Sequence, residues 1–220
     1  MRLLTWNLFH GRAVPGAGRS LAAEFARALD GWEWDVALLQ EVPPWWGPAL
    51  ERGTGASTAR ALTSRNWAPG VQARLGARFP DLLKSGAGGA NVLLVRGKVT
   101  DHRRATVCWW PERRVVHAVR VGDGAWIANV HATVRDEPRA GVDIARARAA
   151  ALEWAAGAPL AIGGDFNTRR PWMPGFDQVA SHRVDHLFAR GLGTGGAAEV
   201  LDAGRLSDHA PLAVTVPVGS

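Results

Sequence analysis

Acidic, amide and imidazole side chains lie next to apolar segments of this sequence, at the points where those segments begin or end. Gly-Asp-Phe-Asn at 164–167 follows the apolar run 159–163, and Ser-Asp-His at 207–209 precedes the apolar run 210–216. If both runs are strands, their ends bring together a carboxylate, an amide and a carboxylate–imidazole pair. Such a set could bind a metal ion and activate a water molecule.

Two more oxygen-bearing side chains occupy equivalent positions. Asn7 ends the opening apolar segment 2–6, and Glu41 ends the apolar segment 35–40. Four strand ends that carry oxygen ligands are more than a purely structural domain needs. The pattern therefore predicts a metal-dependent hydrolase.

The oxygen ligands indicate which metal ion and which reaction to expect. Magnesium prefers carboxylate and amide oxygens, which Asn7, Glu41 and Asp208 would supply, and manganese is the alternative ion. Cys108 is the only cysteine, which excludes a multi-cysteine zinc site. A divalent cation counters the charge of a phosphodiester, which otherwise repels the attacking water.

The remaining polar residues suit the other requirements of phosphodiester hydrolysis. Asp165 is placed to act on the water, and Asn167 to fix the geometry of that water or of a phosphate oxygen. His209 would contact or protonate the developing charge if a carboxylate sets its tautomer. Asp185 is the candidate for that carboxylate.

The elements that must position these residues occur in mixed order. A helix is expected between Ser20 as its cap and Gly31 as its stop, and a second over 142–156. The stretch 43–90 is expected to be a helix-bearing insertion that shapes the substrate site. Strands are expected at 2–7, 35–40, 91–95, 105–109, 115–121, 126–131, 159–163, 184–188, 198–201 and 210–216. This order favours a two-sheet α/β sandwich over a purely parallel sheet.

Composition is consistent with a folded enzyme in one domain, residues 1–220. The chain is 47% hydrophobic with 11 Trp, and its net charge is +6. The charge indicates a polyanionic partner or merely a solvated, arginine-rich surface. The sequence lacks an apolar run of membrane-spanning length and the features of a signal peptide, so we expect a cytoplasmic protein without integral membrane association. We also expect a monomer.

Six short motifs resemble, in order, those of the endonuclease/exonuclease/phosphatase superfamily, which includes deoxyribonuclease I, exonuclease III, sphingomyelinases and inositol polyphosphate 5-phosphatases. They extend from residue 5 to residue 209, and are Thr-Trp-Asn at 5–7, Leu-Gln-Glu at 39–41, Asn-Val-His at 129–131, Gly-Asp-Phe-Asn at 164–167, Val-Asp at 184–185 and Ser-Asp-His at 207–209. The resemblance implies a four-layer α/β/β/α sandwich with two mixed β-sheets, as in deoxyribonuclease I.

The resemblance also implies a role for each matching position. It assigns the metal to Asn7, Glu41 and Asp208. It gives Asp165 and Asn167 the water and transition-state roles. His209 becomes the phosphate-contacting imidazole, with Asp185 as its carboxylate partner. His131 lies where the deoxyribonuclease I-like and sphingomyelinase-like branches have a histidine, whereas exonuclease III-like repair nucleases have a tyrosine. Either Arg113 or Arg114 resembles a phosphate-contacting arginine of some members.

Three functions follow in order of preference. The first is a magnesium-dependent nuclease acting on DNA or RNA, favoured by the basic charge and by loops with Arg and Trp. The second is a phosphatase or a phospholipase- or sphingomyelinase-like phosphodiesterase, favoured by His131 and by the small size of insertions that would grip DNA. The third is a catalytically silent binding module, against which the intact motif set argues.

Tryptophan residues fall in expected loops beside the motif-bearing strands, at 45–46, 109–110 and 172. An exposed indole in such a loop could stack on a base or lie at a membrane interface. Packing within the loop is the simpler alternative.

Overall fold

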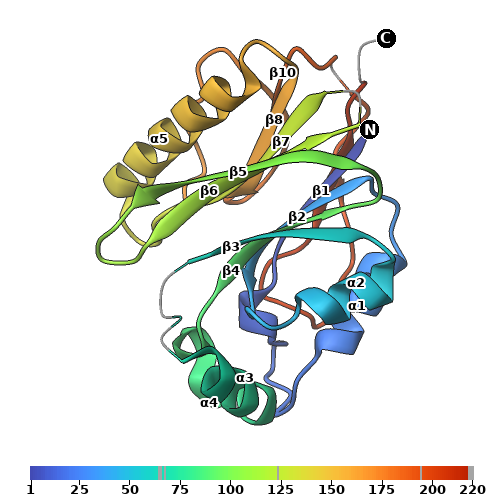
Figure 1. Ribbon diagram of the computed structural model, residues 1–220, viewed down its shortest axis with the longest axis vertical. Coiled ribbons are helices and arrows are strands. Elements are labelled where there is room, and N and C mark those ends of the chain that lie inside the picture. Colours follow the sequence, from blue (N-terminus) through green and yellow to red (C-terminus); the bar gives the residue numbers. More distant parts are fainter. Residues whose placement is uncertain (64–65, 67, 123, 194, 218–220) are drawn as a thin grey trace.

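The fold consists of two six-stranded mixed β-sheets that pack face to face, with helices on their outer faces (Figure 1). The computed structural model describes residues 1–63, 66, 68–122, 124–193 and 195–217. This arrangement confirms the four-layer α/β/β/α sandwich expected from the sequence.

The first sheet combines one parallel pair with antiparallel neighbours. Its spatial order is β11 (Glu199–Val200), β12 (Leu212–Thr215), β1 (Arg2–Asn7), β2 (Val36–Val42), β4 (Ala90–Val95) and β3 (Ser57–Leu62). Strands β1 and β2 are parallel, and the other pairs are antiparallel.

The second sheet repeats this design. Its spatial order is β5 (Val99–Cys108), β6 (Arg114–Val121), β7 (Ala125–His131), β8 (Leu160–Asp165), β10 (Asp185–Arg190) and β9 (Asp177–His182). Strands β7 and β8 are parallel, and the other pairs are antiparallel.

The parallel pair of each sheet delivers predicted site residues to one edge. Asn7 ends β1 opposite Gln40 of β2, and His131 ends β7 opposite Asp165 at the end of β8. Because the carboxyl ends of parallel strands meet at the same edge, each sheet brings a pair of polar side chains to its edge without help from a long loop.

Three apolar clusters hold the layers together. Helices α1 (Ala22–Asp30) and α2 (Gly47–Thr54) cover the first sheet, where Phe25 packs among buried residues of β1 and β2. Helix α5 (Glu137–Ala155) covers the second sheet through Ile144 and a row of alanines. Aliphatic side chains fill the space between the sheets. None of the described helices is long and apolar enough to cross a membrane.

The insertion 43–90 contains helices, as expected, and also the edge strand β3. After α2 and β3 it forms α3 (Pro69–Arg78), α4 (Pro80–Leu83) and the short 3-10 element η2 (Lys84–Ala87), at the bottom of Figure 1. Trp46, which was expected in a loop, is buried against Phe25 with ring centroids 5.4 Å apart. Its indole therefore belongs to the core.

Some boundaries differ from the sequence prediction for identifiable reasons. Helix α5 begins at Glu137 instead of 142, because the Asp136 side chain accepts a hydrogen bond from the Arg139 N–H and caps the first turn. Ser20 does not cap α1, whose N-cap residue is Leu21 without a side-chain hydrogen bond. Strand β9 was not expected, because its mostly exposed edge position removes the apolar alternation of a buried strand.

Candidate active site

A cleft of about 420 Å³ opens at the edge where the two parallel strand pairs end. It is lined from both sheets and from the segment that follows α4. Of the predicted site residues, those that line it are Asn7, Glu41, Arg113, Arg114, His131, Asp165, Asn167, Asp208 and His209. The remaining one, Asp185, is buried directly behind His209.

Asn7 is fixed at the end of β1 by hydrogen bonds on three sides. Its Oδ1 accepts from the Phe9 N–H at 2.9 Å, and its Nδ2 donates to Asp165 Oδ2 at 2.9 Å. Its backbone carbonyl accepts from the Ser207 hydroxyl at 2.6 Å, which ties the loop before β12 to the end of β1. The Ser207 oxygen also accepts from the His209 N–H at 3.1 Å, so the same serine positions His209.

Glu41 leaves β2 at an irregularity of the ladder. The register between β2 and β4 shifts between Leu39 and Val42, and Glu41 has a positive φ of 51°. A bulge re-aims the side chain that it contains, and here the Glu41 carboxylate lines the cleft. One of its oxygens lies 3.1 Å from His10 Nε2.

Asp165 lies at the floor of the cleft, and its position depends on the glycine before it. Gly164 has a φ of 140°, and a Cβ there would lie 1.9 Å from the Val130 carbonyl oxygen, so only glycine lets β8 approach β7 this closely. The buried Asp165 Oδ1 accepts from the Asn167 N–H at 2.9 Å. The Asn167 side chain in turn donates to the Ala132 carbonyl at 3.0 Å.

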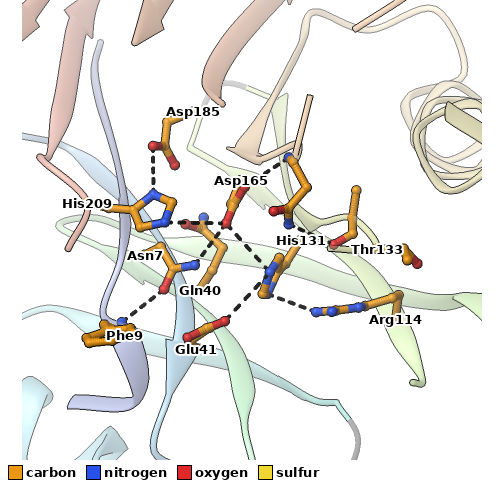
Figure 2. Close-up of polar contacts among 12 residues, drawn as sticks. Asn7, Phe9, Gln40, Glu41, Arg114, His131, Thr133, Asp165, Asp185 and His209 are labelled. Atoms are coloured by element: carbon orange, nitrogen blue, oxygen red, sulfur yellow. Dashed lines mark hydrogen bonds and ion pairs between the residues drawn. The ribbon is translucent and has the colours of Figure 1, made fainter. Parts of the chain in front are cut away.

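His209 flanks Asp165 on one side and has a carboxylate partner (Figure 2). Its Nδ1 lies 2.8 Å from Asp185 Oδ2, and its Nε2 lies 3.9 Å from Asp165 Oδ2. Burial alone would lower the pKa of His209, but the hydrogen bond and charge of Asp185, with the charge of Asp165, raise that pKa to about 9. His209 is therefore an imidazolium at neutral pH.

His131 flanks Asp165 on the other side and has a guanidinium partner. Arg114 NH1 lies 3.2 Å from His131 Nδ1, and because arginine only donates, Nδ1 must accept. Burial and then the Arg114 charge lower the pKa of His131 well below its usual range. The ring is therefore neutral with its proton on Nε2, which lies 3.6 Å from Asp165 Oδ2 and 3.8 Å from Glu41 Oε1.

The two arginines that the sequence could not separate differ in position. Arg114 is buried, and besides His131 it contacts the Glu112 carboxylate at 2.8 Å. Arg113 is half-buried and donates to the backbone carbonyls of Leu62 and Thr63. Arg114 thus lies against a ring of the site, whereas Arg113 lies against the end of β3.

A metal ion would find two different acidic groupings here. Asp165, Asp185 and His209 offer ligand atoms that lie within 4.8 Å of one another. However, hydrogen bonds within the site already engage His209 Nδ1 with Asp185, and both Asp165 oxygens with Asn167 and Asn7. The oxygen atoms of Asn7, Glu41 and Asp208, which the sequence assigned to the metal, also line the cleft, and burial with the Asp165 charge raises the pKa of Glu41 to about 7. A cation beside Glu41 would relieve this excess of negative charge.

Backbone strain is concentrated around the cleft. Nine described non-glycine residues have a positive φ, and six of them line the cleft, namely Phe9, His10, Glu41, Lys84, Arg135 and Asn167. Such conformations cost free energy and persist where the surrounding structure imposes them, often at functional sites. This distribution points to the same edge as the polar side chains.

Several residues of the cleft had no role in the sequence analysis. His10 contacts Glu41, and Arg12, Lys84 and Arg135 add positive charge to the lining. Arg12, Lys84 and Arg135 lie outside the motifs, so no spacing identifies them. His10 lies three residues after Asn7, and this short separation was the one available signal.

Gln40 and Asn129, which lie inside two of the motifs, connect the sheets beneath the cleft. Gln40 Nε2 donates to Asn129 Oδ1 at 2.8 Å, and Asn129 Nδ2 donates to the carbonyls of Leu39 and Val92 at 2.9 and 3.0 Å. Both side chains are fully buried. They therefore fix the first sheet relative to the second, close to Glu41 and His131.

Comparison with known proteins agrees with this geometry. The model of the endonuclease/exonuclease/phosphatase family matches residues 4–209. Among curated proteins, no sequence matches the chain significantly.

Solved structures share the fold over nearly the whole chain. An endonuclease/exonuclease/phosphatase protein from Beutenbergia cavernae has 18% identity and a TM-score of 0.71, covering 100% of this chain and 72% of the other. Mannosyl-6-phosphatase from Bacteroides thetaiotaomicron has 13% identity and a TM-score of 0.72, covering 99% and 100%. TDP2 from Caenorhabditis elegans has 15% identity and a TM-score of 0.70, covering 99% and 75%. At these identities the likeness shows the fold.

Proposed function

The chain belongs to the endonuclease/exonuclease/phosphatase family, and from this premise we propose that it is a magnesium-dependent phosphodiesterase that cleaves DNA or RNA. One observation carries the proposal. The buried Asp165 carboxylate, held by Asn7 and Asn167, lies between an imidazolium and a neutral imidazole at the floor of a cleft with a basic rim. This arrangement suits a water-activating base between two donors to a phosphate.

The oxygen donors that would hold the cation are Asn7, Glu41 and Asp208. When bound, a divalent cation supplies positive charge that offsets the phosphate oxygens and the departing alkoxide. Asp208 is exposed at the mouth of the cleft, and Glu41 lies deeper. The raised pKa of Glu41 supports this assignment, because a carboxylate that is desolvated and lies near the Asp165 charge favours a nearby cation.

The side chains of the cleft would carry out an in-line displacement. Asp165 Oδ2 orients a water molecule and takes its proton as the new O–P bond forms, while Asn167 holds the Asp165 carboxylate in place. The opposite P–O ester bond breaks, and the departing alkoxide takes a proton from solvent to become the alcohol. His209 and His131 donate from Nε2 to the phosphoryl oxygens on which charge increases. Asp185 keeps His209 charged throughout.

Hydrolysis assays test this proposal. We expect magnesium- or manganese-dependent cleavage of bis-(p-nitrophenyl) phosphate and of plasmid DNA or single-stranded RNA. Asp165→Ala and His209→Ala should each lower the rate about 10²- to 10⁴-fold. Asp177→Asn, which changes an exposed aspartate outside the cleft, is the matched control and should keep full activity. Metal-independent cleavage, or full activity of Asp165→Ala, would refute the mechanism.

The metal assignment has a test that does not depend on activity. Saturating magnesium should raise the thermal unfolding temperature, corresponding to about 2.7 kcal/mol at a hundredfold excess over Kd. Glu41→Gln should lose most of this stabilisation, whereas Glu153→Gln, on the exposed side of α5, should retain it. Equal stabilisation of both variants would exclude Glu41 as a ligand.

A phosphatase or lipid-type phosphodiesterase acting on a small phosphoester is the second candidate. The cleft volume of about 420 Å³ lies in the range of small-molecule sites. The likeness to mannosyl-6-phosphatase also covers both chains almost completely. Turnover of the small diester or of sugar phosphates, without cleavage of any nucleic acid, would favour this candidate.

A further inference from the structure

Three loops of the second sheet begin at the edge of the cleft. They are residues 109–113 between β5 and β6, residues 132–136 between β7 and α5, and residues 166–176 between β8 and β9. Strand β6 is antiparallel to β7, and β7 is parallel to β8, so the loops 109–113 and 132–136 and the start of 166–176 lie at the edge where His131 and Asp165 end their strands. The rest of 166–176 crosses to the opposite edge, where β9 begins. We call these three loops the loop row.

The loop row exposes large apolar side chains. Trp109, Trp110 and Trp172 are 75%, 77% and 76% exposed, and Val134 is 48% exposed. Every other tryptophan that the structure describes is buried or half-buried. Because indole is among the more strongly buried side chains, three exposed indoles in loops that begin at one edge indicate a surface that a ligand covers.

Positive charge alternates with these indoles. Each loop carries at least one arginine that is exposed or half-buried, namely Arg113, Arg135, Arg169 and Arg170. The acids of the loop row are Glu112 and Asp136, and both contact arginines, at 2.8 and 3.3 Å. The row therefore presents a net positive surface between its apolar side chains.

The row is continuous with the cleft. Arg113, Val134, Arg135 and Asn167 line the cleft and also belong to the three loops. Neighbouring strands lie about 5 Å apart, so loops on β6, β7 and β8 extend over roughly 10 to 15 Å. A chain-like ligand whose phosphate lies at Asp165 would pass along these loops on leaving the cleft.

We propose that the loop row binds single-stranded nucleic acid, with Trp109, Trp110 and Trp172 stacking on unpaired bases while the arginines contact the phosphates. The inference rests on the proposed function and specifies its substrate. Alternating aromatic and basic side chains match a ligand that alternates flat bases and anionic phosphates. In a duplex the base faces are already stacked on one another, so an indole gains little there. A lipid surface would also accept tryptophan beside arginine, so binding to vesicles is one of the outcomes of the test.

Binding and cleavage of oligonucleotides test the inference. Affinity for a labelled oligothymidylate is measured by fluorescence anisotropy in the Asp165→Asn background, where the ligand stays intact. Trp172→Ala and the double change Trp109→Ala and Trp110→Ala should each weaken binding about 5- to 150-fold per stacked base. When the same tryptophan changes are made in enzyme that keeps Asp165, the ratio of kcat/KM for the oligonucleotide to that for bis-(p-nitrophenyl) phosphate should fall by a similar factor.

The controls separate the alternatives. Val142→Ala, at a 48%-exposed apolar position on α5, should leave the oligonucleotide affinity unchanged. Unchanged affinity in the tryptophan variants, or equal losses on duplex and single strand, would overturn the inference. If the tryptophan variants lose binding to anionic phosphatidylglycerol vesicles but keep oligonucleotide binding, the inference would be overturned in favour of a lipid surface. Tryptophan-dependent oligonucleotide binding by an enzyme that cleaves no phosphodiester would uphold it and refute the proposed function instead.

Discussion

A histidine lies on each side of Asp165, and the two imidazole rings differ in charge. On one side, His209 contacts the Asp185 carboxylate and its pKa is raised to about 9. On the other, His131 contacts the Arg114 guanidinium and its pKa lies well below the usual range. Both rings direct Nε2 toward the same Asp165 oxygen (Figure 2). Burial, with the Arg114 charge, keeps His131 neutral, whereas the Asp185 carboxylate outweighs burial at His209.

A third histidine shows what burial does without either kind of partner. His117 of β6 is fully buried between the sheets, and its Nδ1 lies 3.2 Å from His102 Nε2. Burial, with a smaller effect of His102, lowers the pKa of His117 to about 3. His131 therefore follows the trend of buried histidines, and His209 is the exception, because its carboxylate partner outweighs burial.

In the mechanism that we propose, the two sides of Asp165 have different tasks. The His209 side supplies a positive charge that stabilises an anionic transition state, as long as Asp185 remains ionised. The His131 side supplies a neutral Nε2–H donor whose direction is fixed by Arg114. A phosphate bound above Asp165 would then meet one charged and one neutral donor.

The largest expected effect comes from removing the carboxylate that makes the two sides different. Asp185→Asn should lower kcat/KM about 10²- to 10⁴-fold. It should also move the alkaline limb of the pH–rate profile to lower pH. The imidazolium of His209 is lost as pH rises through its raised pKa, and asparagine cannot raise that pKa. The profile is measured with bis-(p-nitrophenyl) phosphate at saturating metal.

Asp177→Asn again serves as the control for Asp185→Asn and should keep the wild-type profile. An Asp185→Asn enzyme whose alkaline limb does not move would show that His209 does not act as an imidazolium. In that case the two sides would not differ in charge during the reaction.

A smaller effect on the reaction rate is expected from a change on the His131 side of Asp165. Arg114→Met removes the donor to His131 Nδ1 and should lower kcat about 10- to 100-fold, because the ring loses its fixed tautomer. Nitrogen chemical shifts of His131 should change from a single Nε2–H form to a mixture of tautomers. Arg113→Met is the matched control, since it removes a neighbouring guanidinium without touching His131, and it should keep those shifts. Unchanged shifts in Arg114→Met would contradict the assigned role.

The sequence was sufficient to predict the floor of the cleft and the carboxylate partner of His209, but not the partner of His131. Asp165, His209 and Asp185 lie at strand ends within short motifs, so the carboxylate–imidazole pair could be expected from type and position alone. The neutral state of His131 could not be expected, because it depends first on burial of the ring and then on its contact with Arg114. Arg114 is itself buried and contacts Glu112, and spacing encodes neither of these features.

The fold shows a similar division. Strands β1, β2, β7 and β8 are apolar runs buried on both faces, and the sequence located them within a few residues. The segment 43–90 was the least readable, since β3 is an edge strand with alternating exposure and α4 has only four residues. Short and half-exposed elements depend on what they pack against, so their local pattern is weak.

The smallest expected effect concerns stability and uses His117 as the reference for burial alone. The unfolded chain binds a proton at His117 near the ordinary pKa of about 6.5, whereas the folded chain does so only near pH 3. Between these values the unfolded state binds more protons, so the free energy of unfolding falls as pH falls, by up to about 1.4 kcal/mol per pH unit. His117→Leu should remove this part of the slope in urea unfolding curves.

Above pH 6.5 both states of His117 are neutral, so wild type and His117→Leu should then differ by a constant amount. Below it, the wild-type curve should fall more steeply than that of the variant. Parallel curves over the whole acidic range would mean that burial does not depress the pKa of His117. The low pKa of His131 would then have to come from the charges around it, of which Arg114 has the largest effect, and Arg114→Met should raise that pKa toward the ordinary value. The two measurements together therefore separate burial from charge on the His131 side.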